Sequence, residues 1–256
     1  MSDAGVPSDI SGRKIFFLYP TGSVEHQIVT ELIQQEYEIY IIRDHSRMPR
    51  TLSKYRDSVV YVNIDEKMRE DEWDKWIRGL KASLPELKFG VFSSTDDEDI
   101  KNKYVNEIRV ECGFIGLKLD MSRSVNKILE ILAILNIKGR RKYIRASTAR
   151  ETTATINMPY GGSYINGVIK DVSVVGISCV FDHDPELTKN ALFKDIQIRL
   201  QSMLLKVEAI AFGSRMDGNE KNYVLIFTQR IDPDVKVKIR KYIQSNLQSK
   251  MDAELK

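Results

Sequence analysis

A change of rhythm near residue 137 is the feature that most constrains how this chain folds. Before it, five short apolar runs alternate with stretches of helical periodicity. This alternation predicts a parallel sheet covered by helices on both faces, because parallel strands need helical crossovers and bury both of their sides. The expected strands are 14–19, 38–42, 58–64, 89–93 and 113–119, and the expected helices are one following Ser23 and those at 47–56, 71–84, 96–108 and 122–135.

After Arg145 the helical stretches disappear. Short β-branched and apolar segments follow one another, separated by turn signals such as 159–162 and 217–219. Strands at this spacing without intervening helices predict an antiparallel barrel or sandwich. A closing helix is expected from about Asp232, where an Asp–Pro pair suits a helix start. The candidate strands are 152–158, 164–171, 176–181, 195–200, 204–212 and 223–227.

The two rhythms predict an α/β plus β chain. We expect a flexible tail at 1–12, a flavodoxin-like α/β domain at 13–136, a hinge at 137–145, and a β-barrel with its C-terminal helix at 146–256.

Composition places the chain among soluble globular proteins, with 42% hydrophobic and 29% charged residues. No apolar run approaches the ~20 residues that cross a bilayer, and the polar N-terminus does not have the form of a signal peptide. A cytoplasmic protein without a membrane span is expected. The net charge of +3 is too small to indicate nucleic-acid binding by itself.

The residue types in the sequence offer little support for a metal site or a catalytic site. Cys112 and Cys179 are the only cysteines and stand among apolar residues, which predicts buried free thiols. The three histidines are scattered, whereas a structural zinc site needs about four clustered ligands. No Ser-His-Asp set, P-loop or paired carboxylates accompany the motifs described next. We therefore expect neither a metal, nor a cofactor, nor an enzymatic activity.

The hinge carries the first candidate motif, the basic run Lys138 to Arg145, in which Arg141 and Arg145 stand four positions apart. Guanidinium groups present parallel donors that match phosphate oxygens and guanine O6 and N7. Taken alone, the run is more typical of a solvated linker or a weak nucleic-acid patch than of a specific ligand site.

The second candidate motif lies 26 positions further on and contains Asp171, Ser173 and Gly176. In an extended strand alternate residues share a face, so Asp171 and Ser173 are expected to project together while Val172 and Val174 enter the core. Gly176 allows a tight turn or the close approach of a ligand. Taken alone, this pattern is equally typical of a strand that ends in an Asx turn.

Together the two motifs resemble those of the PilZ domain, a family of cyclic di-GMP receptors. Its R-x-x-x-R motif is matched by Arg141 and Arg145, and its D/N-x-S-x-x-G motif by Asp171, Ser173 and Gly176. The resemblance covers 138 to the C-terminus. It implies a β-barrel with a C-terminal helix, and cyclic di-GMP as the ligand.

The resemblance also implies roles for individual side chains. The arginines would hold phosphates or guanine edges, Asp171 would accept from guanine N1–H and N2–H₂, and Ser173 would donate to a phosphate or base. In this family an arginine at the position of Arg140 often accompanies two intercalated ligand molecules, so Arg140 is expected to join the site.

The expected function is that of a cyclic di-GMP effector. Ligand binding would change the arrangement of the two domains and signal to a protein partner, with motility or virulence as family-implied outputs. Two alternatives stay open: a nucleic-acid-binding regulator that uses 138–145, and a PilZ adaptor that has lost its ligand.

The first half resembles a response-regulator receiver domain in its element order. A receiver needs an acidic pair after its first strand and a phosphorylatable aspartate at the end of its third. No acid follows the first strand, and Asn63 and Asp65 compete for the second position. Ser94 or Thr95 and Lys118 match the receiver pattern loosely. This favours a pseudo-receiver that serves as a protein-interaction surface.

Overall fold

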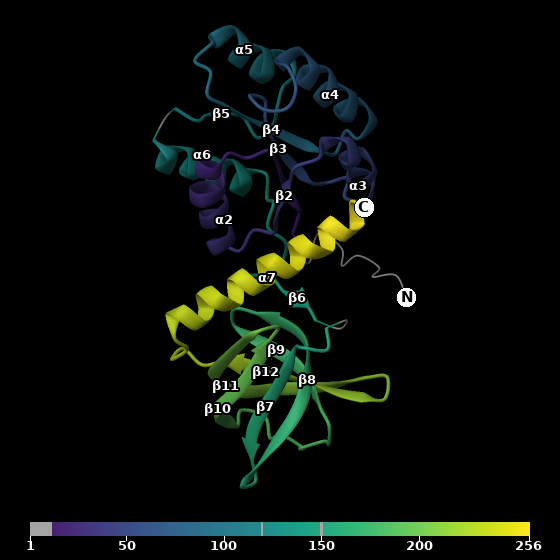
Figure 1. Cartoon of the computed structure of the whole chain (residues 1–256), viewed down its shortest axis with the longest axis vertical. Helices are drawn as coiled ribbons and strands as arrows, with labels where there is room; N and C mark the ends of the chain where they lie inside the picture. Colours follow the sequence, from purple (N-terminus) through teal and green to yellow (C-terminus); the bar gives the residue numbers. More distant parts are fainter. Residues whose placement is uncertain (1–11, 119, 149–150) are drawn as a thin grey trace. The chain divides into compact units, whose positions relative to one another are not determined.

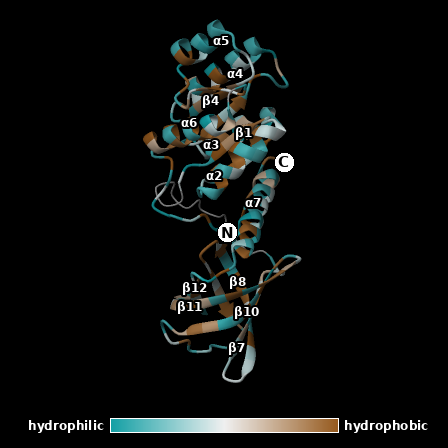
Figure 2. Cartoon of the chain, turned by 90° about the vertical axis from the view of Figure 1, so that its left-hand side faces the viewer, coloured by the Kyte–Doolittle hydropathy of each residue, from teal (hydrophilic) through white to brown (hydrophobic). Residues whose placement is uncertain are grey.

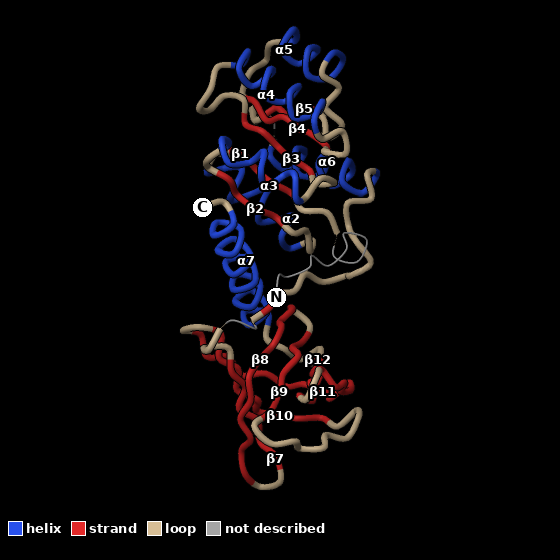
Figure 3. The backbone as a smooth tube through the Cα atoms, turned by 90° about the vertical axis from the view of Figure 1, so that its right-hand side faces the viewer, coloured by secondary structure: helices blue, strands red, loops and turns tan. Residues whose placement is uncertain are grey.

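The computed structural model describes residues 12–118, 120–148 and 151–256, so the expected tail lies outside it except for Gly12. The chain divides into two compact units. The first contains the residues up to Lys142 together with Gln248–Lys256, and the second contains Tyr143–Leu247. The units differ in secondary structure, helix and strand alternating in the first and strands prevailing in the second (Figures 1 and 3).

The first unit is built on a five-stranded parallel sheet of order β2-β1-β3-β4-β5. The predicted parallel sheet is therefore confirmed, and all five expected strands are present. The last one is shorter than expected, because regular pairing with β4 ends at Gly116. The strands are β1 (Ile15–Leu18), β2 (Ile39–Ile42), β3 (Val59–Asn63), β4 (Lys88–Ser93) and β5 (Phe114–Gly116).

The expected helices are present, and three of them change helical type along their length, one of them beginning as the 3₁₀ turn η2 that leads directly into α3. The helix after Ser23 begins as a π-helix, η1, and continues as a short α-helix, α2. The charged helix begins at Asp97, whose side chain accepts hydrogen bonds from the amides of Asp99 and Ile100. It ends in a second π-helix, η3. The elements are η1 (Val24–Val29), α2 (Thr30–Gln34), η2 (His45–Arg47), α3 (Met48–Lys54), α4 (Glu70–Ser83), α5 (Glu98–Asn102), η3 (Lys103–Glu107) and α6 (Met121–Ile134).

Apolar side chains on both faces of this sheet are buried. Ile15 and Phe17 share one cluster with residues of η1, α2 and α6. On the other face Phe16 lies near Tyr55, which follows α3, and Phe89 meets Trp76 of α4 edge to face. Figure 2 shows the hydrophobic colouring of these strands. The near-continuous apolar strands of the sequence are thus explained by burial on both sides.

The second unit is a closed antiparallel barrel. Its sheet has the order β6-β8-β7-β10-β11-β12-β9, and a further pairing between β8 and β9 closes the ring. The barrel alternative expected from the sequence is thus confirmed over the sandwich. The strands are β6 (Ala146–Ser147), β7 (Thr155–Tyr160), β8 (Ser163–Ser173), β9 (Gly176–Phe181), β10 (Leu192–Leu200), β11 (Met203–Asp217) and β12 (Glu220–Phe227).

The barrel differs from the sequence expectation by one added strand, by a shorter first turn and by strand bounds, since β10, β11 and β12 extend beyond the expected 195–200, 204–212 and 223–227. The two-residue strand β6 is an addition, paired with β8 through Ala146 and Val172. It is too short to leave a periodic signal. The hairpin turn after β7 is confined to Gly161 and Gly162, both at positive φ, because Pro159 still belongs to β7. The barrel interior is filled by alternate strand residues such as Ile196 and Ile198.

Helix α7 (Pro233–Glu254) follows the barrel, as expected from the Asp–Pro start. The Asp232 carboxylate accepts a hydrogen bond from the Asp234 amide at 2.8 Å. Ile239 and Ile243 are buried in the barrel core, with Val235 and Leu247 packed against it. The face of α7 that carries these apolar residues therefore covers the barrel. Within the described residues, no helix is both long enough and apolar enough to cross a membrane.

Candidate ligand-binding site

The two predicted motifs meet at an ion pair between Arg145 and Asp171. Arg145 immediately precedes β6, and Asp171 lies near the end of β8, opposite Ser147 of β6. A guanidinium nitrogen of Arg145 lies 3.6 Å from Oδ1 of Asp171. The two side chains are 48% and 27% exposed, so the pair is accessible from solvent. Pairing of β6 with β8 thus brings one residue of each motif together.

A neighbouring serine fixes the Asp171 carboxylate. Ser178 of β9 lies opposite Asp171 in the ladder, and its hydroxyl donates to Oδ2 of Asp171 at 2.5 Å. The register of the ladder shifts just before Asp171, between Ile169 and Asp171, and a bulge of this kind re-aims the side chain that follows it. Ser178 was not predicted as a site residue, because its position opposite Asp171 follows only from the strand register.

Ser173 and Gly176 form the turn between β8 and β9. The Ser173 hydroxyl is buried and donates to the carbonyl oxygen of Gly176 at 3.1 Å. A Cβ atom added to Gly176 would overlap the Leu225 carbonyl oxygen and lie 3.2 Å from Cα of Ile226. Gly176 therefore lets β12 approach β9 closely. Val172 and Val174 are buried, as expected.

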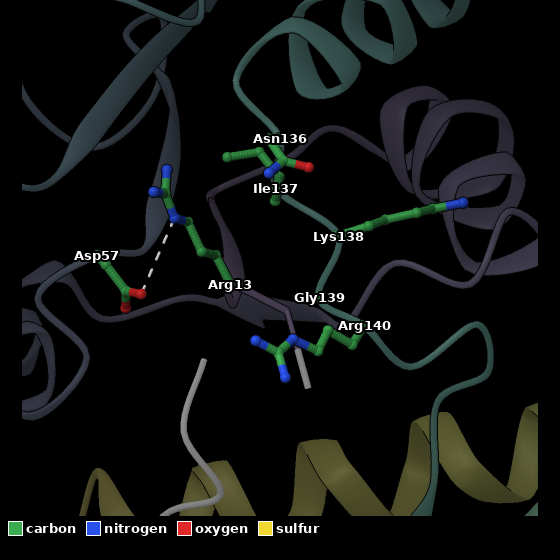
Figure 4. Close-up of a pocket in the computed structure, with 7 residues that line it drawn as sticks. All are labelled: Arg13, Asp57, Asn136, Ile137, Lys138, Gly139 and Arg140. Atoms are coloured by element: carbon green, nitrogen blue, oxygen red, sulfur yellow. Dashed lines mark ion pairs between the residues drawn. The ribbon is translucent and has the colours of Figure 1, made fainter. Parts of the chain in front are cut away.

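Arg140 and Arg141 lie on the exposed segment that follows α6 and belong to the first unit. Arg140 lines an open pocket of about 410 Å³ together with Arg13, Asp57 and residues 136–139. Figure 4 shows Arg13 pointing toward Asp57, at an ion-pair distance of 3.9 Å, whereas Lys138 extends away from this pair. The Lys138 ammonium lies 4.7 Å from the ring centre of Tyr37. Residue spacing does not indicate that Arg13 is a neighbour of Arg140.

The predicted site residues thus fall into two groups. Arg145, Asp171, Ser173 and Gly176 belong to the barrel unit and cluster around the ends of β6, β8 and β9. Arg140 and Arg141 belong to the first unit.

The residues at the carboxyl ends of the parallel strands show how far the first unit follows the receiver pattern. Asn63 ends β3, is buried, and donates from its amide to the Tyr19 carbonyl oxygen at 3.0 Å. Asp65 follows two residues later and accepts from the Ser93 hydroxyl and the Ser94 amide, both at 2.6 Å. Lys118 lies 2.5 Å from Asp96. The third strand therefore ends in an amide side chain, and the nearby Asp65 carboxylate is hydrogen-bonded to residues at the end of β4.

Aromatic side chains gather where a receiver carries its metal-binding acids. Tyr19 directly follows β1 in a left-handed backbone conformation, with φ +51°, and is buried. Its hydroxyl lies 2.9 Å from Nδ1 of His45, and its ring lies 6.0 Å from that of Trp73. His45 also meets Trp73 edge to face at 5.2 Å. This end of β1 is thus closed by packed rings.

Both cysteines are buried and free, as predicted. Burial raises the pKa of each thiol to about 12, which keeps both protonated at neutral pH. Among the residues that the structure describes, there is no cluster of three or more His, Cys, Asp or Glu that could hold a metal ion.

Neither the family models nor the curated proteins give a match to this chain. Among solved structures, the chain is similar to the PilZ domain with c-di-GMP of YcgR from Escherichia coli, at 17% identity and a TM-score of 0.39, over 45% of this chain and 97% of that one. It is similar to the MrkH–c-di-GMP complex of K. pneumonia at 17% identity and a TM-score of 0.38, over 46% of this chain and 56% of that one.

A response regulator from Thermotoga maritima is similar at 13% identity and a TM-score of 0.40, over 48% of this chain and 98% of that one. The similar structures thus include both PilZ and receiver-type proteins, and the chain spans little more than half the length of MrkH.

Proposed function

We propose that this chain is a non-enzymatic effector that binds cyclic di-GMP through Arg141, Arg145 and Asp171. The observation that carries the proposal is the solvent-accessible pair of Arg145 and Asp171, which brings the two motifs together at the edge of the barrel. An exposed ion pair contributes only ~0–1 kcal/mol to stability. A ligand can therefore replace the contact between the two side chains at little cost.

The chemistry of the pair suits a guanine nucleotide that carries phosphodiesters. Asp171 presents an oxygen whose orientation Ser178 fixes, and a guanine offers N1–H and N2–H₂ as donors on one edge. Arg145 offers parallel donors to a phosphate or to guanine O6 and N7. Adenine lacks the N1–H and N2–H₂ donors, so Asp171 is expected to discriminate cyclic di-GMP from cyclic di-AMP.

The remaining motif residues have narrower roles in this proposal. Ser173 and Gly176 shape the β8–β9 turn that holds Asp171 in place. Arg140 is the candidate contact for a second, intercalated ligand molecule. Titration calorimetry gives the stoichiometry, and two molecules per chain are expected in the wild type against one in Arg140→Ala.

Signalling follows if the ligand prefers one arrangement of the two units. Binding would order residues 138–145, change how the units are arranged, and so alter what the first unit offers a protein partner. An output in motility or virulence is part of the proposal and comes from the family resemblance alone.

Arginine substitutions test the site. Arg141→Ala and Arg145→Ala should each weaken cyclic di-GMP binding by at least roughly 10- to 100-fold, the loss of a charge-assisted hydrogen bond, with an unchanged circular dichroism spectrum. Arg199→Ala is the matched control, because Arg199 is an exposed barrel arginine on β10. Wild-type affinity in both motif variants would refute the site.

The same titration separates the nucleic-acid alternative. Binding of DNA or RNA through 138–145 would fall steeply with salt and would be insensitive to Asp171→Ala. For cyclic di-GMP the proposal expects binding that depends weakly on salt and is strongly sensitive to Asp171→Ala.

A further inference from the structure

The outer edge of strand β2 is covered by the end of the chain. β2 is the first strand in the order of the parallel sheet, so no strand among the described residues lies along its far side. The Tyr19 amide donates to the Ile42 carbonyl, so the backbone N–H and C=O groups of Ile42 face inward, toward β1. The N–H and C=O groups of Ile41 point outward, and an edge of this kind is a template for a further strand.

Gln248, in the last turns of α7, fills this position with its side-chain amide. The Ile41 amide donates to Oε1 of Gln248 at 2.9 Å, and Nε2 of Gln248 donates to the Ile41 carbonyl at 2.9 Å. A pair of residues in an antiparallel ladder exchanges the same two bonds. The Gln248 amide thus stands where the peptide groups of an added strand would lie.

The rest of the C-terminal segment is attached mainly by polar contacts at the surface. Glu254 accepts from the Tyr55 hydroxyl at 3.1 Å and lies 3.5 Å from the Lys54 ammonium, and Arg47 donates to the Leu255 carbonyl at 3.0 Å. Exposed contacts of this type are individually weak. Met251 is the buried exception. The segment Gln248–Lys256 is therefore suited to reversible attachment.

We propose that the β2 edge is a self-association site, on which a second copy of the chain pairs antiparallel once its own C-terminal segment detaches. A two-fold axis at Ile41 would give each Ile41 the two hydrogen bonds that Gln248 now supplies, and a self-complementary patch is what a two-fold dimer requires. The same register sets Tyr40 opposite Ile42 of the other copy, and β2 contains no charged residue that could oppose its own kind. This surface does not depend on the proposed cyclic di-GMP site.

Sedimentation equilibrium on the full chain tests the proposal. Gln248→Ala removes both bonds to Ile41 and should tighten the dimer dissociation constant by at least about tenfold over wild type. Gln248→Glu keeps the size of the side chain but sets an acceptor against the Ile41 carbonyl, and should act in the same direction. The control is Ser249→Ala, at an exposed neighbouring position. Adding Ile41→Lys to Gln248→Ala should reverse the gain, because two lysines would then face each other across the axis.

Site-specific crosslinking tests the register. Both native cysteines are buried, so a short thiol–thiol crosslinker should join Gln248→Ala chains through an added Ile41→Cys substitution and not through Ser46→Cys, at an exposed position outside β2. A dissociation constant unchanged from wild type in both Gln248 variants would overturn the proposal. So would a dimer that crosslinks at position 46 and not at position 41.

Discussion

The guanidinium of Arg145 lies 3.6 Å from the carboxylate of Asp171, although the two residues are 26 positions apart in the sequence. The short strand β6 makes this possible, since it pairs with β8 directly beside Asp171. The contact joins two motifs, of which the first alone is more typical of a linker and the second alone is equally typical of a strand end. It lies at the edge of the barrel, where we propose that the ligand binds.

Gly176→Ala should destabilise the barrel. Its Cβ would overlap the Leu225 carbonyl of β12, and overpacking of this kind costs ~1–3 kcal/mol. Urea unfolding measures the loss in the free energy of unfolding. Gly213→Ala is the control, because nothing lies within 4 Å of a Cβ there. Equal stability of the two variants would contradict the structural role given to Gly176.

Ser173→Ala should lower the free energy of unfolding by about 1 kcal/mol, the usual value of a lost intramolecular hydrogen bond. The reason is that its buried hydroxyl donates to the Gly176 carbonyl. Cyclic di-GMP affinity, measured where the variant is fully folded, should fall less than in Arg145→Ala. A larger fall would instead assign Ser173 a direct ligand contact.

Asp184 should contribute to stability down to unusually acidic pH. Hydrogen bonds from Tyr223, the Glu186 amide and Lys221 lower its pKa to about 2. Because the pKa in the folded state lies below the unfolded value of about 3.9, the contribution is complete above that value and is lost as pH falls toward 2.

Denaturant unfolding of wild type and Asp184→Asn across acidic pH measures this effect. The stability difference between the two proteins should be constant near neutrality and shrink between about pH 5 and pH 2. A difference that does not change over this range would show that Asp184 has no lowered pKa.

Acetyl phosphate with Mg²⁺ should not phosphorylate the receiver-like unit. Asn63 ends β3 with an amide, and both carboxylate oxygens of Asp65 already accept hydrogen bonds from Ser93 and Ser94. Intact-mass spectrometry after incubation checks this. A stable mass gain that Asp65→Asn removes would restore phosphotransfer as a function of this half.

The architecture could be predicted from the sequence because it is recorded in local periodicity. Apolar strands alternating with amphipathic helices predicted the parallel sheet, and Gly161 and Gly162 marked a hairpin. The surroundings of the motifs could not be predicted in the same way. Ser178 reaches Asp171 through strand register, and Arg13 lies beside Arg140 through tertiary packing. Neither relationship has a signal in residue spacing.

The most direct test of the central claim is a calorimetric titration of the full chain with cyclic di-GMP, with cyclic di-AMP as the control. The wild type should bind cyclic di-GMP and bind cyclic di-AMP far more weakly, because only guanine offers Asp171 two donors on one edge. Asp171→Ala should abolish that preference. Absence of heat with cyclic di-GMP, or equal affinity for the two dinucleotides in the wild type, would contradict the account.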